Sequence, residues 1–123
     1  MSGEMREATF LILTALASGS LHGYGIIREV AEMSAGRVKL LPGTLYTALD
    51  RLAAQGLVER EREEVQDGRL RRYYRLTGDG VEALGFETGR LRELATAAEQ
   101  RLAAARGEDG HPGPVRNLKP RHA

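Results

Sequence analysis

The stretch RVKLLPGTLYTALDRLAAQG, residues 37–56, carries clear signals for both the start and the end of a helix. Pro42 suits the first turn of a helix, because its missing N–H has no partner to lose there. Gly56 stands where a left-handed C-cap is expected, so the stretch predicts a helix over 42–55. The apolar residues of this helix recur at helical spacing and form one narrow stripe, made of Leu45, Leu49 and Leu52.

The other face of the 42–55 helix is polar and carries hydroxyl groups, an aromatic ring, an acid, a cation and an amide. Its members are Thr44, Tyr46, Thr47, Asp50, Arg51 and Gln55. Hydroxyls, cations and amides are groups that contact phosphates and base edges in DNA-binding proteins. An ordinary amphipathic helix with a solvated face has the same composition, so this stretch alone leaves both interpretations open.

A length of 123 residues indicates one domain, or one small domain with an appendage, and the 41% hydrophobic and 28% charged residues are ordinary for a globular protein. The absence of cysteine excludes disulfides and thiolate metal sites, and it fits a cytoplasmic protein. No apolar run approaches the length of a membrane span, and the acids Glu4 and Glu7 argue against a signal peptide. The net charge of +1 is uninformative, but the run RLRRYYR at 69–75 holds four arginines and no acid.

Two helices and a short strand are expected before the 42–55 helix. The first helix covers 4–17, with Ser2 as a possible N-cap, and its apolar surface indicates that it is mostly buried. The second helix covers about 24–34, and residues 37–41 could form one small strand. His22 has no further ligand at metal-binding spacing, so a surface or capping role is expected.

A β-hairpin is expected after the 42–55 helix, with strands at 57–65 and 69–77 and a tight turn at the Asp-Gly step of 66–68. In the return strand Leu70, Arg72, Tyr74 and Leu76 would share one face, and Arg69, Arg71, Tyr73 and Arg75 the other. Arg71 and Arg75 could pair with glutamates of the first strand. A basic ribbon lying along a nucleic acid backbone would also explain so charged a hairpin.

A long helix is expected over 78–106, with Thr77 as its N-cap. Apolar or small residues alternate at spacings of three and four and form a heptad seam: Val81, Leu84, Thr88, Leu91, Ala95, Ala98, Leu102 and Ala105. A solvated helix of this length is poorly stable alone, so we expect a homodimer whose contacts include Leu84, Thr88, Leu91, Ala95, Ala98 and Leu102. Phe86 lies off the seam and is expected to pack on the first helix, and 107–123 should be a disordered tail.

The chain shows no pattern of an enzyme site. It has no P-loop, no dinucleotide-binding glycine pattern and no cysteine nucleophile. Two of its three histidines, His111 and His122, fall in the expected tail. We therefore expect no catalysis, no metal site and no cofactor.

The order of elements and four motifs together resemble the PadR family of transcriptional regulators, in its small subgroup with a single C-terminal helix. The motifs are the apolar first helix, LHGYGI at 21–26, LPGTLYTALDRLAAQGLVER at 41–60 and RRYYRLTGDG at 71–80. The resemblance implies a mainly α fold with a small β-hairpin. It would comprise a winged helix-turn-helix over 1–77, a dimerisation helix over 78–106 and a tail over 107–123.

The resemblance also implies that a homodimer binds double-stranded DNA at a palindromic operator. The third helix would enter the major groove, the start of the second helix and the residue Lys39 would meet phosphates, and the wing would lie near the minor groove. The DNA-binding residues on this basis are Tyr24, Lys39, Gly43, Thr44, Tyr46, Thr47, Arg51, Gly68, Arg69, Arg71 and Arg72. Such regulators are usually repressors that a small hydrophobic or aromatic effector releases.

Two features depart from the family pattern. Leu41 stands where a serine often caps the GTLY helix, and the absence of tryptophan gives no basis for transferring an aromatic ligand pocket. The alternative function is a winged-helix module for protein–protein assembly, because a fold does not by itself determine a function.

Overall fold

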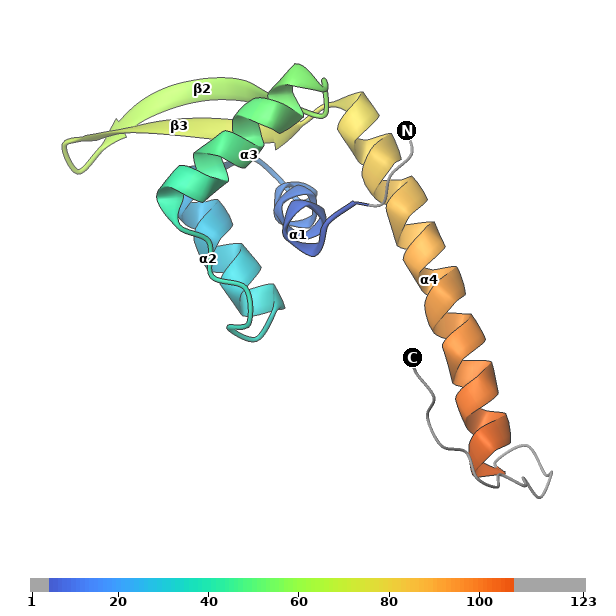
Figure 1. Cartoon of the computed structure of the whole chain (residues 1–123). Helices are drawn as coiled ribbons and strands as arrows, with labels where there is room; N and C mark the ends of the chain where they lie inside the picture. The colour runs from blue at the N-terminus through green and yellow to red at the C-terminus, as the bar shows by residue number, and fades with distance from the viewer. Residues whose placement is uncertain (1–4, 108–123) are drawn as a thin grey trace. The chain divides into compact units, whose positions relative to one another are not determined.

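The computed structural model describes residues 5–107 as a mainly α-helical chain with a small antiparallel sheet (Figure 1), as the sequence predicted. The elements are α1 (Glu7–Leu16), β1 (Leu21–His22), α2 (Gly23–Met33), α3 (Pro42–Ala54), β2 (Val58–Gln66), β3 (Arg69–Leu76) and α4 (Gly78–Arg106). The strands lie in the order β1-β3-β2. The chain forms two compact units, and the second begins at Thr88, within α4.

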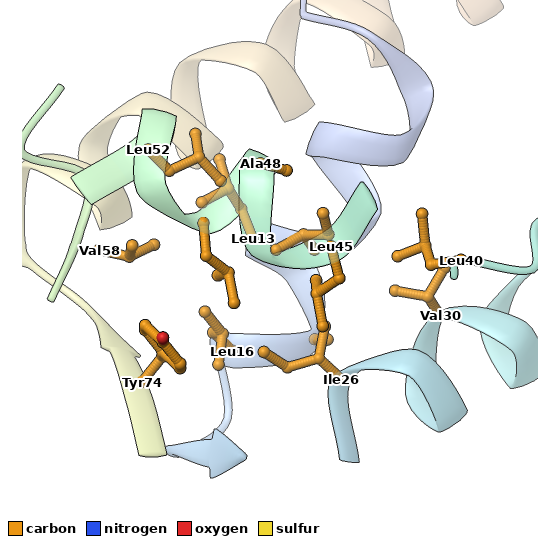
Figure 2. Packing of buried hydrophobic residues seen from close by; sticks show 13 residues of the cluster. Leu13, Leu16, Ile26, Val30, Leu40, Leu45, Ala48, Leu52, Val58 and Tyr74 are labelled. Carbon is orange, nitrogen blue, oxygen red and sulfur yellow. The ribbon is translucent and has the colours of Figure 1, made fainter. Parts of the chain in front are cut away.

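The hydrophobic core joins the first three helices to the base of the sheet (Figure 2). Leu45, Leu49 and Leu52 are 0%, 0% and 1% exposed, so the apolar stripe predicted for α3 is confirmed. Full burial of a leucine side chain stabilises a fold by about 1.5–3 kcal/mol. These contacts therefore hold α3 firmly against the core and leave its opposite side exposed. Besides Leu45 and Leu52, Figure 2 labels the core members Leu13, Leu16, Ile26, Val30, Leu40, Ala48, Val58 and Tyr74.

Besides the two hairpin strands, the sheet contains β1. The prediction of a short strand at 37–41 is wrong. Leu21 and His22 pair with Tyr74 and Tyr73 of β3. The 37–41 segment instead closes the end of α2, because the Val38 amide donates to Ser34 Oγ at 2.9 Å. An amide engaged in this way does not serve a β-ladder.

The helix caps follow local chemistry. His22 caps α2 as expected, because its Nδ1 accepts a hydrogen bond from the Gly25 amide at 3.2 Å. Thr77 caps α4 as expected, because its Oγ1 accepts from the Gly80 amide at 3.0 Å. Arg6 occupies the N-cap of α1 without a side-chain hydrogen bond, and the expected cap Ser2 lies outside the described residues.

The predicted hairpin forms with a two-residue turn at Asp67 and Gly68, whose φ angles are +52° and +76°. Positive φ at both positions matches the right-handed twist of the flanking strands. Tyr73 and Tyr74 are 9% and 5% exposed although they point to opposite faces of β3. Both are buried because the core covers one face while the His22 ring, 5.2 Å away, covers Tyr73 on the other.

The first turns of α4 belong to the first compact unit. Leu84 packs against the core, but Phe86 is 77% exposed, so the predicted packing of Phe86 on the first helix is wrong. Residues two positions apart in a helix point to different faces, so Phe86 does not share the buried side of Leu84. The prediction for the tail lies outside the described residues, apart from Gly107. None of the described helices is both long and apolar enough to cross a membrane.

Candidate nucleic-acid interface

The outer face of α3 is set by its buried residues. Because Leu45, Ala48, Leu49 and Leu52 point into the core, the residues on the opposite side of the helix point to solvent. Gly43, Thr47 and Asp50, spaced by four and three, run along the middle of this outer face, and all are exposed. The flanks carry Thr44 and Arg51 on one side and Tyr46 on the other.

Tyr46 lies against the first residue of α2. A Cβ atom added to Gly23 would stand 2.3 Å from the hydroxyl oxygen of Tyr46, so the tyrosine occupies space that only a glycine leaves free. Tyr46 is 39% exposed, and its hydroxyl end is thereby placed beside the N-terminus of α2. Helix N-termini carry partial positive charge and unpaired amides, which favour anions.

His22, which caps the same helix, is held in its neutral form. Partial burial lowers the pKa of His22 below the ordinary 6.5, and the nearby charges of Arg71 and Arg28 lower it further. A neutral ring suits the cap, because Nδ1 must be free to accept the Gly25 amide.

A hollow of about 360 Å³ lies between α2, α3 and β3. It is lined by His22, Gly23, Tyr24, Tyr46, Arg69, Leu70, Arg71 and Arg72. The structure thus brings together five residues that the sequence proposed for DNA: Tyr24, Tyr46, Arg69, Arg71 and Arg72. Guanidinium groups, hydroxyls and a helix N-terminus together bind phosphate oxygens well.

The arginines of the hairpin divide into paired and unpaired groups. Four pair with glutamates: Arg60 with Glu63, Arg62 with Glu61 and Glu64, Arg72 with Glu63, and Arg75 with Glu59. The predicted pairing of Arg75 is confirmed. Within residues 5–107, Arg69 and Arg71 have no carboxylate partner, so their charges are the ones on this hairpin that are available to an external anion.

The predicted pairing of Arg71 with a glutamate is wrong. Glu64 stands opposite Arg71 in the register, but its Oε2 accepts from Arg62 Nε at 2.6 Å instead. The Arg71 guanidinium carbon lies 5.6 Å from the centre of the Tyr24 ring, and its Nε is buried without a hydrogen-bond partner. The arginine is therefore stacked at the edge of the hollow with its charge uncompensated.

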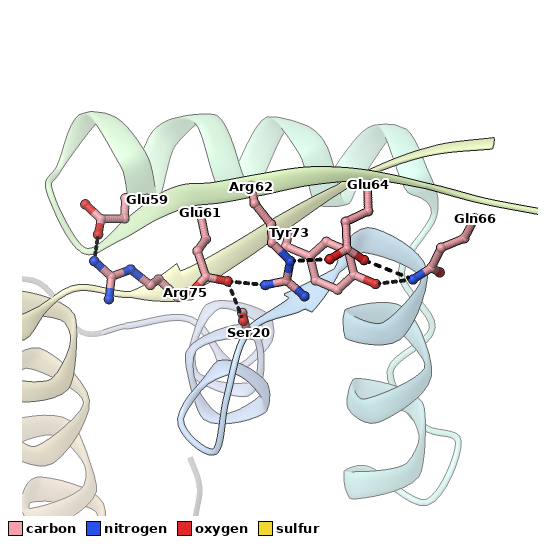
Figure 3. A network of polar contacts seen from close by, with 8 residues as sticks. All are labelled: Ser20, Glu59, Glu61, Arg62, Glu64, Gln66, Tyr73 and Arg75. Carbon is pink, nitrogen blue, oxygen red and sulfur yellow. Dashed lines mark hydrogen bonds and ion pairs between the residues drawn. The ribbon is translucent and has the colours of Figure 1, made fainter. Parts of the chain in front are cut away.

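A polar network links the two strands of the wing to each other and, through one hydrogen bond, to Ser20 (Figure 3). Ser20 donates to Glu61 Oε1 at 2.7 Å, and Gln66 donates to the Tyr73 hydroxyl at 2.8 Å. Arg62 lies 4.0 Å above the Tyr73 ring. The hydrogen bond from Arg62 lowers the pKa of the Glu64 carboxyl, which keeps that carboxyl charged. Arg62 is thus engaged internally.

Arg51 and Gly43 were also predicted to contact DNA, and they lie in different surroundings. Arg51 donates to Thr9 Oγ1 at 3.2 Å, so its guanidinium is turned toward α1 and away from the outer face. Gly43 is exposed, and a Cβ added there would meet nothing within 4 Å. The last three predicted residues, Lys39, Thr44 and Gly68, are exposed.

Sequence reasoning did not assign His22, Gly23 or Leu70 to the interface, yet all three line the hollow. The run LHGYG at 21–25 was the available signal, since two glycines at a helix start indicate close approach of another group. Among residues 5–107 there is no cluster of side chains that could hold a metal ion.

Residues 5–107 leave the seam predicted for α4 largely uncovered. Leu91 and Leu102 are 38% and 47% exposed, and Leu94 beside the seam is 56% exposed. Leu84 differs, because it packs partly against the core of its own chain. Leu91, Leu94 and Leu102 are thus apolar side chains of α4 that the described residues leave partly exposed.

Known proteins share this architecture and sequence. The profile of the transcriptional regulator PadR-like family matches residues 12–85. The chain is 42% identical to the transcriptional regulator Rv3488 of Mycobacterium tuberculosis over 84 residues, which make up 68% of this chain and 75% of that protein.

Solved structures agree with this assignment. A PadR family transcription regulator from Clostridium difficile R20291 is similar with a TM-score of 0.62 and 28% identity, over 79% of this chain and 99% of that one. Bacillus subtilis PadR, solved in complex with operator DNA, is similar with a TM-score of 0.57 and 26% identity, over 65% of this chain and 45% of that one. The chain therefore belongs to the PadR-like family of transcriptional regulators, as its motifs indicated.

Proposed function

We propose that this protein is a homodimeric repressor that binds a palindromic DNA operator in the cytoplasm. The observation that carries the proposal is the hollow of about 360 Å³, which gathers the aromatic rings of Tyr24 and Tyr46 and three arginines beside the N-terminus of α2. Such a surface fits a sugar–phosphate backbone lying between α3 and the hairpin. The structure of Bacillus subtilis PadR with operator DNA supports the same assignment.

In this proposal the elements divide the work of recognition. The outer face of α3 enters the major groove with Gly43, Thr44, Tyr46 and Thr47, and Arg51 binds only if it leaves Thr9. Tyr24 and Lys39 meet phosphates. The wing lies near the minor groove with Gly68, Arg69, Arg71 and Arg72. Arg71 contributes more than Arg72, because Glu63 already neutralises Arg72 through a contact of 3.1 Å.

The second copy is supplied through α4. Pairing of two such helices along Leu84, Thr88, Leu91, Ala95, Ala98 and Leu102 covers the exposed leucines. A two-fold dimer of this kind binds half-sites about one turn of DNA apart. We also propose that a small hydrophobic or aromatic effector releases the protein from DNA.

A salt titration tests the central claim. Fluorescence anisotropy with a duplex from upstream of the protein's own gene measures affinity at several salt concentrations. The logarithm of the association constant should fall linearly with that of the salt concentration, by roughly 0.9 for each phosphate neutralised. An affinity that does not change with salt, or no binding to any duplex, would contradict DNA binding.

A further inference from the structure

Asp50 is a carboxylate in the middle of the face that would meet DNA. It is exposed on the side of α3 opposite the buried Leu45 and Leu52, one turn beyond Thr47. Among residues 5–107 it takes part in no side-chain hydrogen bond or ion pair. Its chain neighbour Arg51 is bonded to Thr9 and does not neutralise it.

A free carboxylate on this face works against phosphate binding, because duplex DNA carries a dense negative charge. It becomes favourable when it accepts a hydrogen bond from a base. In the major groove the cytosine N4 amino group is the donor that carboxylates read, whereas adenine is paired best by an amide that also donates to N7.

We propose that Asp50 accepts a hydrogen bond from the amino group of a cytosine and so specifies a C·G pair in each half-site. The inference rests on the proposed function, since it requires α3 to lie in the major groove. Thr47 lies one turn away on the same face, and the open space at Gly43 lets the DNA approach the helix closely. Tyr46, on the flank of the same face, is seated against Gly23.

The first experiment selects binding sites from a random duplex library with the full-length protein. Wild type should enrich sites with a fixed C·G pair at one position of each half-site. Asp50→Ala should lose the preference at that position alone, and Asp50→Asn should shift it toward adenine. Asp50→Ala should also bind random-sequence DNA several-fold more tightly, because a repulsive charge is gone.

Glu32→Ala is the matched control, because Glu32 is an exposed acid near the end of α2 and outside the hollow. It should leave the selected sequence unchanged. Circular dichroism melting checks folding, and alanine is a better helix former than aspartate at position 50. Loss of selectivity by a variant that melts like wild type therefore reports on recognition.

The second experiment removes the amino group itself. In the selected site, the cytosine is replaced by 2-pyrimidinone, which is cytosine without its amino group. Wild type should bind the 2-pyrimidinone duplex about tenfold or more weakly than the cytosine duplex. Asp50→Ala should bind the two duplexes equally. If Asp50→Ala selects the same sequence as wild type, the inference is wrong while DNA binding stands. If wild type enriches no sequence, the proposed function fails and the inference fails with it.

Discussion

Gly43 has no reason within its own chain to be glycine. A side chain there would meet nothing within 4 Å, and its φ is not in the left-handed region. Gly43→Ala should therefore raise the free energy of unfolding, by up to about 0.5–1 kcal/mol. It should weaken DNA binding, because the methyl group would stand between α3 and the duplex. Denaturant unfolding measures the free energy of unfolding, and anisotropy titration measures the affinity for DNA. An increase in both the free energy of unfolding and the affinity would contradict the proposed contact.

Gly23 acts through Tyr46. An added Cβ would lie 2.3 Å from the Tyr46 hydroxyl oxygen and 2.9 Å from Cζ, so Gly23→Ala must displace the ring. We expect weaker DNA binding from an otherwise folded domain, because the exposed ring is able to move. In a double-mutant cycle with Tyr46→Ala, the Gly23→Ala change should cost little further affinity. Additive losses would show that Gly23 serves another purpose.

His22 makes the stability of α2 depend on pH. The pKa of His22 is lowered in the folded state, so protonation favours the unfolded chain. Its contribution is complete above the ordinary pKa of 6.5 and is lost as the pH falls through the folded-state value. His22→Asn keeps a capping acceptor but does not titrate. The free energy of unfolding of wild type should fall relative to this variant between pH 7.5 and 5, and parallel curves would contradict the cap.

At the scale of elements, the hairpin separates structural arginines from arginines that are available to DNA. Arg71 has no acidic partner within residues 5–107, whereas Arg75 pairs with Glu59. Arg71→Ala should weaken binding to all duplexes. The slope of the logarithm of the association constant against that of the salt concentration should become shallower by the equivalent of about one phosphate contact. Arg75→Ala is the matched control, and its salt slope should stay close to that of wild type. The same anisotropy titration measures both, and equal slopes for the two variants would overturn the division.

At the scale of the whole molecule, the proposed dimer depends on α4. Leu91 is 38% exposed in the single chain, so Leu91→Glu should leave the monomer folded while burying a charge in the dimer seam. We expect dissociation to monomers and a loss of DNA affinity of about 100-fold, because the two half-sites no longer bind together. Light scattering at several concentrations measures the mass. Glu93→Lys, which changes charge on the outer side of the same turn, should remain dimeric.

The sequence alone determined the features that depend on near neighbours in the chain. The leucine spacing predicted the buried side of α3, the Asp-Gly step predicted the hairpin turn, and Thr77 was recognised as the cap of α4. Helical periodicity, turn angles and capping each involve residues within about four positions, so the sequence contains all the partners. The motifs also identified the family correctly. The individual DNA contacts and the dimer seam stay predictions.

Contacts between residues that are distant in the sequence became visible only in the folded chain. The third strand is Leu21–His22 because β3 presents a free edge to it, whereas the 37–41 segment closes the end of α2. Local sequence also could not show that Glu64 prefers Arg62 over Arg71, because several glutamates and arginines compete across one hairpin. The hollow beside Tyr46 has the same origin. It requires β1, α2, α3 and β3 to converge, and the packing of the core sets that convergence.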